Sequence, residues 1–313
     1  MQTKTRVIAI LCADIHLSLN PPVWRSNEPD WFAAMKRPLD AIKALQATCY
    51  NCPVFCAGDI FDKWDSSAEL INWAVDNLPD KIYAIPGQHD MPEHNLDLMD
   101  KSAYTTLCKA EKIKTFKKQH TYTSVILNTY GFPFGKEIKS AKKETYSNII
   151  NMAVAHQYVW YGNNKHNKTT AEQCVGNLSL DKNGRVKGYD VIVFGDNHKG
   201  FITKVGKTTI FNCGSLMRRK SDEDDYKPMI GLLYNDGRVL PCYLDISKDK
   251  YLESVKGLDE NEEADFDMSA FANELTKLGK SALDFTEAMK LYMQRNKVNS
   301  DVVNLVLNAM EIK

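Results

Sequence analysis

The chain has 313 residues, of which 43% are hydrophobic and 26% charged. This usage is typical of a globular protein and excludes a collagen-like, coiled-coil or wholly disordered chain. Forty basic and forty acidic residues give a formal net charge of zero, so any nucleic-acid partner must be held by a local patch or by metal ions.

The first half of the chain alternates short apolar runs with helical patterns, which is typical of an α/β sheet built from crossover units. Helices are expected over residues 30–48, where Asp30 is a suitable N-cap, and over 66–77. Pro38 is expected to disturb or divide the first helix. Buried strands are expected at residues 7–13, 53–57 and 81–85.

From about residue 113 short strands alternate with turns, which predicts a second and more antiparallel sheet. Asp236 and Gly237 form a turn dipeptide that predicts a hairpin. We therefore expect an α/β fold in which two sheets pack face to face, as a sandwich flanked by helices. The strands of this half are expected at residues 122–128, 153–155, 191–194, 208–211, 230–234 and 239–244.

The length favours one large domain with an appendage. We expect a catalytic domain over residues 1–250, followed over 251–313 by an acidic linker and a small helical segment. The apolar run near the N-terminus is too short and wrongly flanked for a signal peptide. No run approaches the ~18 apolar residues of a membrane span, so we expect a cytoplasmic protein without membrane association.

Three of the eight cysteines, Cys49, Cys52 and Cys56, lie close together in the sequence. A tetrahedral thiolate site needs a fourth ligand, and none lies nearby in the sequence. Because a reduced cysteine in apolar surroundings packs as a small hydrophobe, we favour a structural role for these three over a metal site.

Polar side chains that can bind metal ions follow five of the predicted strands, at the C-terminal end of each. Open α/β sheets place their sites at this edge. Each motif alone is common, but five in a fixed order favour a metal site over chance. The residues are Asp14 and His16, then Asp59, then Gln88, His89 and Asp90, then His156, and finally Asp196 and His198.

A mixed set of oxygen and nitrogen ligands suits manganese, iron or zinc. Two such ions about 3.5–4 Å apart clamp a phosphoryl group when one carboxylate bridges them. The expected reaction is attack on phosphorus by a hydroxide held between the ions. A histidine that is not a ligand would protonate the leaving oxygen.

Over residues 7–215 these motifs resemble those of the calcineurin-like metallophosphoesterases, which run D-x-H, GD, GNHD or GNHE, H and GHxH. Residues 58–62, 87–92 and 211–215, followed by Arg218, resemble the SbcD-type DNA nucleases within that superfamily. These are the bacterial and phage counterparts of the eukaryotic double-strand-break repair nuclease. The resemblance implies the metallophosphoesterase fold and an exonuclease or endonuclease of DNA repair, recombination or replication.

The resemblance also implies a role for each residue at the strand ends. His89 would be the leaving-group acid, oriented by Asp90. The ligands of two divalent ions would be Asp14, His16 and His198 for the first ion, Asp59 as the bridge, and Gln88, His156 and Asp196 for the second.

Two positions depart from the family pattern, and both concern the second ion. Gln88 stands where asparagine is usual, and Asp196 stands where a histidine is usual. Glutamine keeps a carbonyl donor, whereas aspartate replaces a neutral nitrogen with an anionic oxygen, so the site becomes harder in character. We therefore predict manganese, ahead of magnesium, iron or zinc.

Two other functions stay open. One is a metal-dependent phosphatase of small molecules or phosphoproteins, because one fold supports several substrates. The other is a catalytically silent scaffold with a degenerate second site, as in the retromer subunit that shares this fold. The retention of Asp59, His89, Asp90 and His156 together argues against the scaffold, because burying uncompensated charge costs several kcal/mol.

Substrate contacts are predicted from basic and aromatic side chains. Arg218 and Arg219 would hold a DNA phosphate; the alternative is a solvated basic loop offset by the acidic residues 222–225. Residues 157–188 interleave aromatic and basic residues, either to stack on unpaired bases or as an ordinary surface loop. His94 is a further candidate for substrate binding.

The helices after residue 267 are expected either to pack on the catalytic domain or to present an apolar face to a partner. The resemblance implies a coiled-coil ATPase subunit of the SbcC type as that partner. A homodimer is also compatible with the sequence.

Overall fold

The computed structural model describes residues 5–116, 122–124, 126–141, 149–163 and 170–252. The chain divides into two compact units, Met1–Tyr251 and Leu252–Lys313, and the first unit is described below. The predicted acidic linker and C-terminal helices fall outside the described residues. Within the described part of the chain, no helix combines the length and the hydropathy that crossing a membrane requires.

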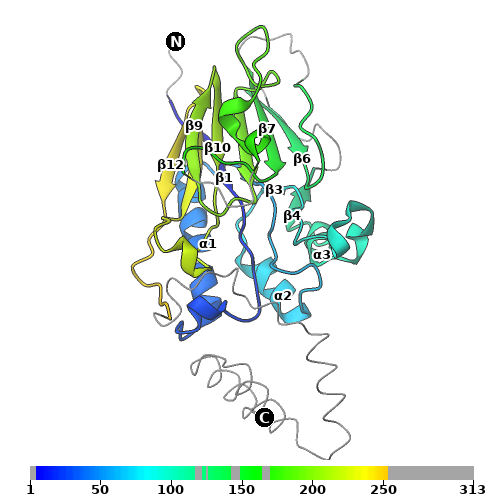
Figure 1. Ribbon diagram of the computed structural model, residues 1–313. Coiled ribbons are helices and arrows are strands. Elements are labelled where there is room, and N and C mark those ends of the chain that lie inside the picture. The colour runs from blue at the N-terminus through cyan, green and yellow to red at the C-terminus, as the bar shows by residue number, and fades with distance from the viewer. Residues whose placement is uncertain (1–4, 117–121, 125, 142–148, 164–169, 253–313) are drawn as a thin grey trace, which may run out of the picture. The chain divides into compact units, whose positions relative to one another are not determined.

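The first unit contains two six-stranded sheets (Figure 1). The first sheet has the order β12 (Val239–Tyr243), β11 (Met229–Tyr234), β1 (Val7–Cys12), β2 (Val54–Cys56), β3 (Ile82–Ala84) and β4 (Ile113–Thr115). The second has the order β5 (Tyr122–Thr123), β6 (Leu127–Phe132), β7 (Ile150–His156), β8 (Val191–Gly195), β10 (Thr208–Asn212) and β9 (Phe201–Val205).

Three α-helices, α1 (Trp31–Thr48), α2 (Ala68–Asn77) and α3 (Ala103–Lys109), cover the outer face of the first sheet (Figure 1). Successive side chains of a strand point to opposite faces of the sheet, so each strand of the first sheet contributes to two apolar layers. In β1, Leu11 points into the core between the two sheets, whereas Ile10 and Cys12 point toward the helices. The predicted α/β fold with two packed sheets and outer helices is therefore confirmed.

Helix α1 begins as the sequence predicts, because the Asp30 carboxylate accepts a hydrogen bond of 2.9 Å from the backbone N–H of Ala33. Pro38 is buried inside this helix, which continues through it to Thr48 and is not divided. Helix α2 is capped in the same way by Ser67.

The expectation of a more antiparallel second sheet is wrong. Its central strands β6, β7, β8 and β10 pair in parallel, and only its edge strands β5 and β9 pair antiparallel. A parallel pair needs a crossover of a dozen or more residues, and the connections 133–149 and 157–190 are long enough. The hairpin predicted at Asp236 and Gly237 is confirmed between β11 and β12, but it extends the first sheet.

Cys52 and Cys56 lie in the apolar core beneath the helices, as does Cys12. All eight cysteines are free thiols, and burial raises the pKa of Cys52 to about 12. Cys12, Cys52 and Cys56 therefore pack as small apolar side chains, and the partly buried Cys49 packs against the same core.

Candidate metal centre

The C-terminal ends of five strands, taken from both sheets, bring the predicted metal ligands together. Asp14 and His16 follow β1, Asp59 follows β2, and Gln88, His89 and Asp90 follow β3; His156 ends β7, and Asp196 and His198 follow β8. The edge where the two sheets meet therefore carries all the residues that the sequence singled out for metal binding.

The residues expected to hold the first ion form one group. One ligand atom from each of Asp14, His16 and His198 lies within 4.8 Å of the others. The Nε2 atoms of His16 and His198 face each other at 3.1 Å. Because a metal–nitrogen bond measures about 2.0–2.1 Å, two nitrogens at this separation fit one ion.

Asp59 lies between this group and the residues expected to hold the second ion. The carboxylate of Asp59 belongs to two groups of possible metal ligands. One group contains Asp14 and His156, and the other contains His16 and His89. Oδ2 of Asp59 is 3.9 Å from Nε2 of His16 and 3.3 Å from Nε2 of His156. This is the position that a bridging carboxylate takes in a two-metal site.

The two departures from the family pattern are partners of each other. Nε2 of Gln88 donates a hydrogen bond of 2.8 Å to Oδ1 of Asp196. The backbone N–H of Asp196 in turn lies 3.1 Å from both carboxylate oxygens of Asp14. Because the amide nitrogen of Gln88 is hydrogen-bonded to Asp196, its carbonyl oxygen Oε1 is left to bind a metal ion.

Among the predicted ligands, four buried polar atoms have no hydrogen-bond partner in the described residues: Nδ1 of His16, Oδ2 of Asp59, Oε1 of Gln88 and Nε2 of His156. Orphaned buried polar atoms are rare and costly. Each of the last three is an electron-pair donor, and together they are the donor set that a divalent cation accepts. The side chains present therefore fit bound divalent ions.

The electrostatics of the centre also favour a cation. Burial acts to lower the pKa of His156, but the charges of Asp59, Asp14 and Asp196 raise it well above its usual value. Burial also raises the pKa of Asp14 to about 7. The cluster of buried carboxylates thus attracts positive charge, whether from a proton or from a metal ion.

Nδ1 forms a hydrogen bond in His156 and His198 and faces a carboxylate in His16, so Nε2 of each imidazole is left for the centre. Nδ1 of His156 is 2.5 Å from the carbonyl of Ala57. Nδ1 of His198 is 2.9 Å from Oε1 of Glu223, and Nδ1 of His16 is 3.5 Å from Oδ1 of Asp62. Such outer partners fix the tautomer and the orientation of metal-binding histidines.

The backbone is strained at the same positions. Asp14, His16, Asp59 and Asp196 have positive φ angles of 49°, 49°, 52° and 84°. The left-handed region is uncommon for residues other than glycine and clusters at functional sites. The strain turns each side chain sharply away from its strand and toward the centre.

Two glycines make room for the ligands. A Cβ atom on Gly58 would lie 2.2 Å from Nδ1 of His156, and one on Gly87 would lie 2.1 Å from Oδ1 of Asp59. Both glycines precede a predicted catalytic or metal-binding residue, so the Gly-Asp and Gly-Gln-His motifs have a steric origin.

His89 is exposed at the rim of the centre, with its ring centroid 5.1 Å from that of His16. Its Nδ1 is 3.0 Å from the carbonyl of Asp62, and its backbone N–H donates to Oδ1 of Asp59. The structure therefore positions the His89 ring through Asp62, whereas the resemblance implied Asp90.

Asp90 is fully buried, and its carboxylate accepts hydrogen bonds from the backbone N–H groups of Ile60, Phe61 and Gly87. Burial and the nearby charge of Asp59 raise its pKa to about 7. Asp90 thus joins the loops after β2 and β3, and acts on the centre by fixing those loops.

The structure places two of the predicted substrate-binding residues in different surroundings. His94 lines a recess of about 190 Å³ with Trp64, His89 and other residues, and its ring centroid is 6.0 Å from that of Phe134. Arg218 donates through Nε to the carbonyl of Tyr226.

Arg219 is the third predicted substrate-binding residue, and it is only 9% exposed. Its Nη1 donates a hydrogen bond of 2.7 Å to Oδ1 of Asp62. Glu223, which belongs to the acidic run 222–225, is 1% exposed and therefore does not form part of a solvated loop. Asp62, Arg219 and Glu223 form a network behind the metal centre that the sequence did not reveal.

The aromatic segment predicted over residues 157–188 begins at the centre. Gln157 and Tyr158 line a second recess, of about 510 Å³, together with Phe134, His156 and Asp196. Farther along, Trp160 donates through Nε1 to the carbonyl of Thr170. Residues 164–169 fall outside the described part of the segment.

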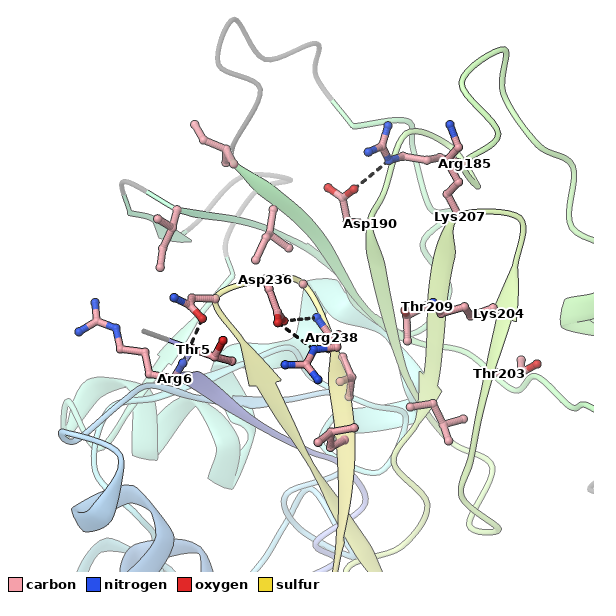
Figure 2. A pocket seen from close by; sticks show the side chains of 18 of the residues that line it. Thr5, Arg6, Arg185, Asp190, Thr203, Lys204, Lys207, Thr209, Asp236 and Arg238 are labelled. Atoms are coloured by element: carbon pink, nitrogen blue, oxygen red, sulfur yellow. Dashed lines mark hydrogen bonds and ion pairs between the residues drawn. The ribbon is translucent and has the colours of Figure 1, made fainter. Parts of the chain in front are cut away.

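A wide groove at the opposite edge of the sheets is separate from this centre (Figure 2). It is lined by Arg6 before β1, Asp190 before β8 and Arg238 in the β11–β12 hairpin, among other residues, and Asp190 pairs with Arg185 at 2.8 Å. Six residues of extended strand separate Asp190 from Asp196, or about 20 Å. The residues that line the groove include none of the predicted metal ligands.

Comparison with known proteins gives one family match. The model of the family described as calcineurin-like phosphoesterase matches residues 9–200. These residues contain every predicted metal ligand and His89. A search of the curated proteins gave no significant match.

Solved structures with a similar fold share little sequence with the chain. A putative 5′-nucleotidase from Staphylococcus aureus is 10% identical, with a TM-score of 0.46, and the match covers 77% of this chain and 54% of that one. The calcineurin-like phosphoesterase YfkN from Bacillus subtilis is 13% identical, with a TM-score of 0.43 and coverages of 78% and 91%. A 5′-nucleotidase precursor from Thermus thermophilus is 13% identical, with a TM-score of 0.44 and coverages of 79% and 56%. The chain thus spans about half the length of the two 5′-nucleotidases.

Proposed function

The chain belongs to the calcineurin-like phosphoesterase family, and from that premise we propose that it is a two-metal phosphodiesterase that cleaves DNA. The observation that carries the proposal is the convergence of seven donor side chains at one edge of the two sheets, four of them with buried polar atoms that lack a hydrogen-bond partner in the described structure. A scaffold with a decayed site would have to leave these atoms uncompensated.

The roles of the residues follow from their positions. Asp14, His16 and His198 would hold one ion, Asp59 would bridge, and Gln88, His156 and Asp196 would hold the other. When bound, two divalent ions supply an activated water nucleophile and neutralise charge on the phosphoryl oxygens. His89, exposed and held through Nδ1 by the carbonyl of Asp62, offers Nε2 to protonate the leaving oxygen.

The shape of the surroundings supports a diester substrate. One recess, with Trp64 and His94, adjoins His89, and the other, with Phe134 and Tyr158, adjoins His156. A phosphodiester carries a group on each side of phosphorus, whereas a monoester carries only one. Both recesses present aromatic side chains, on which nucleobases stack without regard to sequence.

DNA is the diester that we favour because residues 58–62, 87–92 and 211–215 resemble those of the SbcD-type nucleases. Manganese is the proposed metal, since Gln88 and Asp196 offer oxygen donors to the second ion. The SbcC-type partner and the homodimer stay predictions, as does the cytoplasmic location.

The proposal is tested by incubating the full chain with manganese and 4-nitrophenyl phosphate, bis(4-nitrophenyl) phosphate or linear DNA. We expect cleavage of DNA and of the bis ester. Turnover of the monoester alone would establish the phosphatase instead. No turnover of any of these substrates with any divalent metal would establish the silent scaffold.

His89→Asn provides the matched variant. We expect cleavage of DNA to fall by roughly 100-fold to 10,000-fold, because its alkoxide leaving group needs a proton. Hydrolysis of bis(4-nitrophenyl) phosphate should fall far less, since 4-nitrophenolate leaves without one. Both metal ions should remain bound, and loss of either ion would contradict the role of His89 as an acid.

A further inference from the structure

The loop that follows β10 is hydrogen-bonded to the backbone of the metal centre. The N–H of Ser215 donates to the carbonyl of His198 at 2.9 Å, and the N–H of Leu216 donates to the carbonyl of Asp14 at 3.1 Å. The hydroxyl of Tyr226 donates to the carbonyls of Cys213 and Ser215. Residues 213–226 therefore form a fixed wall behind the centre.

From this wall the side chain of Arg219 reaches Asp62. Nη1 of Arg219 is 2.7 Å from Oδ1 of Asp62, the same oxygen that lies 3.5 Å from Nδ1 of His16. The Arg219 side chain is 10% exposed, so its charge is neutralised inside the protein. The guanidinium thus fixes the carboxylate that faces His16.

The backbone of Arg219 holds the second carboxylate. Oε2 of Glu223 accepts hydrogen bonds from the N–H groups of Arg219 at 2.6 Å and Lys220 at 3.3 Å. Its other oxygen, Oε1, is 2.9 Å from Nδ1 of His198. One residue therefore anchors the outer partners of both imidazoles that face each other at 3.1 Å.

We propose that Arg219 is a positioning residue for the first metal ion: it links Asp62 and Glu223, and through them it holds His16 and His198, which come from different sheets, at the spacing of one ion. This role rests on the metal centre of the proposed function and does not depend on the substrate. It differs from the phosphate contact that the sequence suggested, because the Arg219 side chain is only 10% exposed and points its Nη1 to Asp62 inside the protein.

The decisive measurement is a calorimetric titration of the full chain with manganese, comparing Arg219→Met with Arg219→Lys and Lys220→Met. We expect Arg219→Met to weaken one of the two manganese sites by roughly 10-fold to 100-fold, the usual effect of losing an outer partner, and to leave the other site unchanged. Arg219→Lys should recover most of that affinity, because a single bond to Asp62 needs only a point charge.

Lys220→Met is the matched control. It also removes one positive charge, but from the exposed side chain of the next residue. Both manganese affinities should stay at the wild-type value in this variant. The proposal is overturned if Arg219→Met binds both ions normally while its KM for DNA rises and becomes less salt-dependent, because those changes indicate a phosphate contact.

Should Arg219→Met fail to fold, Asp62→Asn breaks the same ion pair from its other side. The amide keeps an oxygen near Nδ1 of His16 but loses the charge that Arg219 fixes, so one manganese affinity should fall and the other should not. Unchanged affinities for both ions would overturn the proposal. A wild-type chain that binds two ions but does not cleave DNA refutes only the nuclease function.

Discussion

Gln88 and Asp196 both stand where the resemblance leads us to expect another residue, and a hydrogen bond of 2.8 Å joins them. An asparagine at position 88 would be one methylene shorter, and a histidine at position 196 would offer a ring nitrogen instead of a carboxylate. The pair thus replaces one donor arrangement with another, since the amide nitrogen is used by Asp196 and the amide oxygen remains.

Replacing Gln88 with leucine should therefore disable the second metal site. Gln88→Leu removes both the orphaned Oε1 and the bond to Asp196, so we expect manganese affinity at that site to fall at least 10-fold, with the first site retained. Metal content after dialysis and calorimetry measure the change. Gln157→Leu, an exposed neighbour of His156, is the control. Two full-affinity sites in Gln88→Leu would show that Gln88 is not a ligand.

Gly58 tests the steric origin of the Gly-Asp motif. Gly58→Ala places a Cβ atom 2.2 Å from Nδ1 of His156 at a φ of 102°. The free energy of unfolding should therefore fall by more than about 1 kcal/mol, and the affinity for the second metal ion should fall as well. Gly135→Ala is a matched control, because its φ of 75° is also positive but the space around it is open. Urea unfolding compares the two variants. Equal losses in both would mean that backbone conformation alone explains the glycine.

The N-cap of helix α1, Asp30, is predicted from the sequence and can be tested by mutation. Asp30→Ala removes the acceptor for the N–H of Ala33, so the free energy of unfolding should fall by about 1 kcal/mol. Asp30→Asn keeps a side-chain oxygen and should cost only a few tenths of that amount. Denaturant unfolding of the three proteins measures the difference, and an equal loss in both variants would point to the charge of Asp30 instead of its cap.

The elements that the sequence revealed are those whose own residues carry the pattern. Strands β1 and β2 are unbroken apolar runs, and their direction follows from the helices between them. By contrast β4 reads Ile-Lys-Thr and buries only Ile113, so it is not an apolar run, and α3 has seven residues, too few to display a helical period. The exposed face of strand β9 carries Ile202 as well as Lys204, so its sequence lacks the regular alternation of apolar and polar residues that marks a half-buried strand.

The same distinction holds for the metal centre. Its ligands could be predicted because each follows an apolar strand, so the fold brings them to one edge. Asp62, Arg219 and Glu223 could not, because their roles depend on contacts between separate loops: Asp62 and Arg219 are 157 residues apart, and His198 and Glu223 are 25 residues apart. A charged residue in a loop carries no local sign that it will be buried beside a histidine.

Across the first unit, a buried charge cluster ties the end of the unit to the residues before and within α1. Arg25 is fully buried and pairs with Glu28 and, at 3.2 Å, with Asp249. Arg37 joins the same two carboxylates at 2.7 and 2.8 Å. Glu28 also accepts the backbone N–H of Lys250, so residues 249 and 250 are held against residues 25–37.

This cluster should make stability depend on pH in a defined window. Burial acts to raise the pKa of Glu28, but the hydrogen bonds from Lys250, Arg25 and Arg37 outweigh it and hold that pKa below its usual value. A carboxyl group whose folded pKa is lowered stabilises the fold above its unfolded pKa, about 4.3, and that contribution is lost as the pH falls through the folded pKa.

Glu28→Gln should therefore lower the free energy of unfolding by about 3 kcal/mol near neutral pH, because it leaves buried guanidinium charge partly uncompensated. The difference from wild type should shrink as the pH falls below about 4, where the wild-type carboxylate itself becomes protonated. Urea unfolding of both proteins across this range measures it, with Asp40→Asn as a control for an exposed carboxylate in a surface ion pair. A Glu28→Gln deficit that stays constant from neutral to acidic pH would show that the amide disturbs packing, and that the charge of Glu28 does not stabilise the cluster.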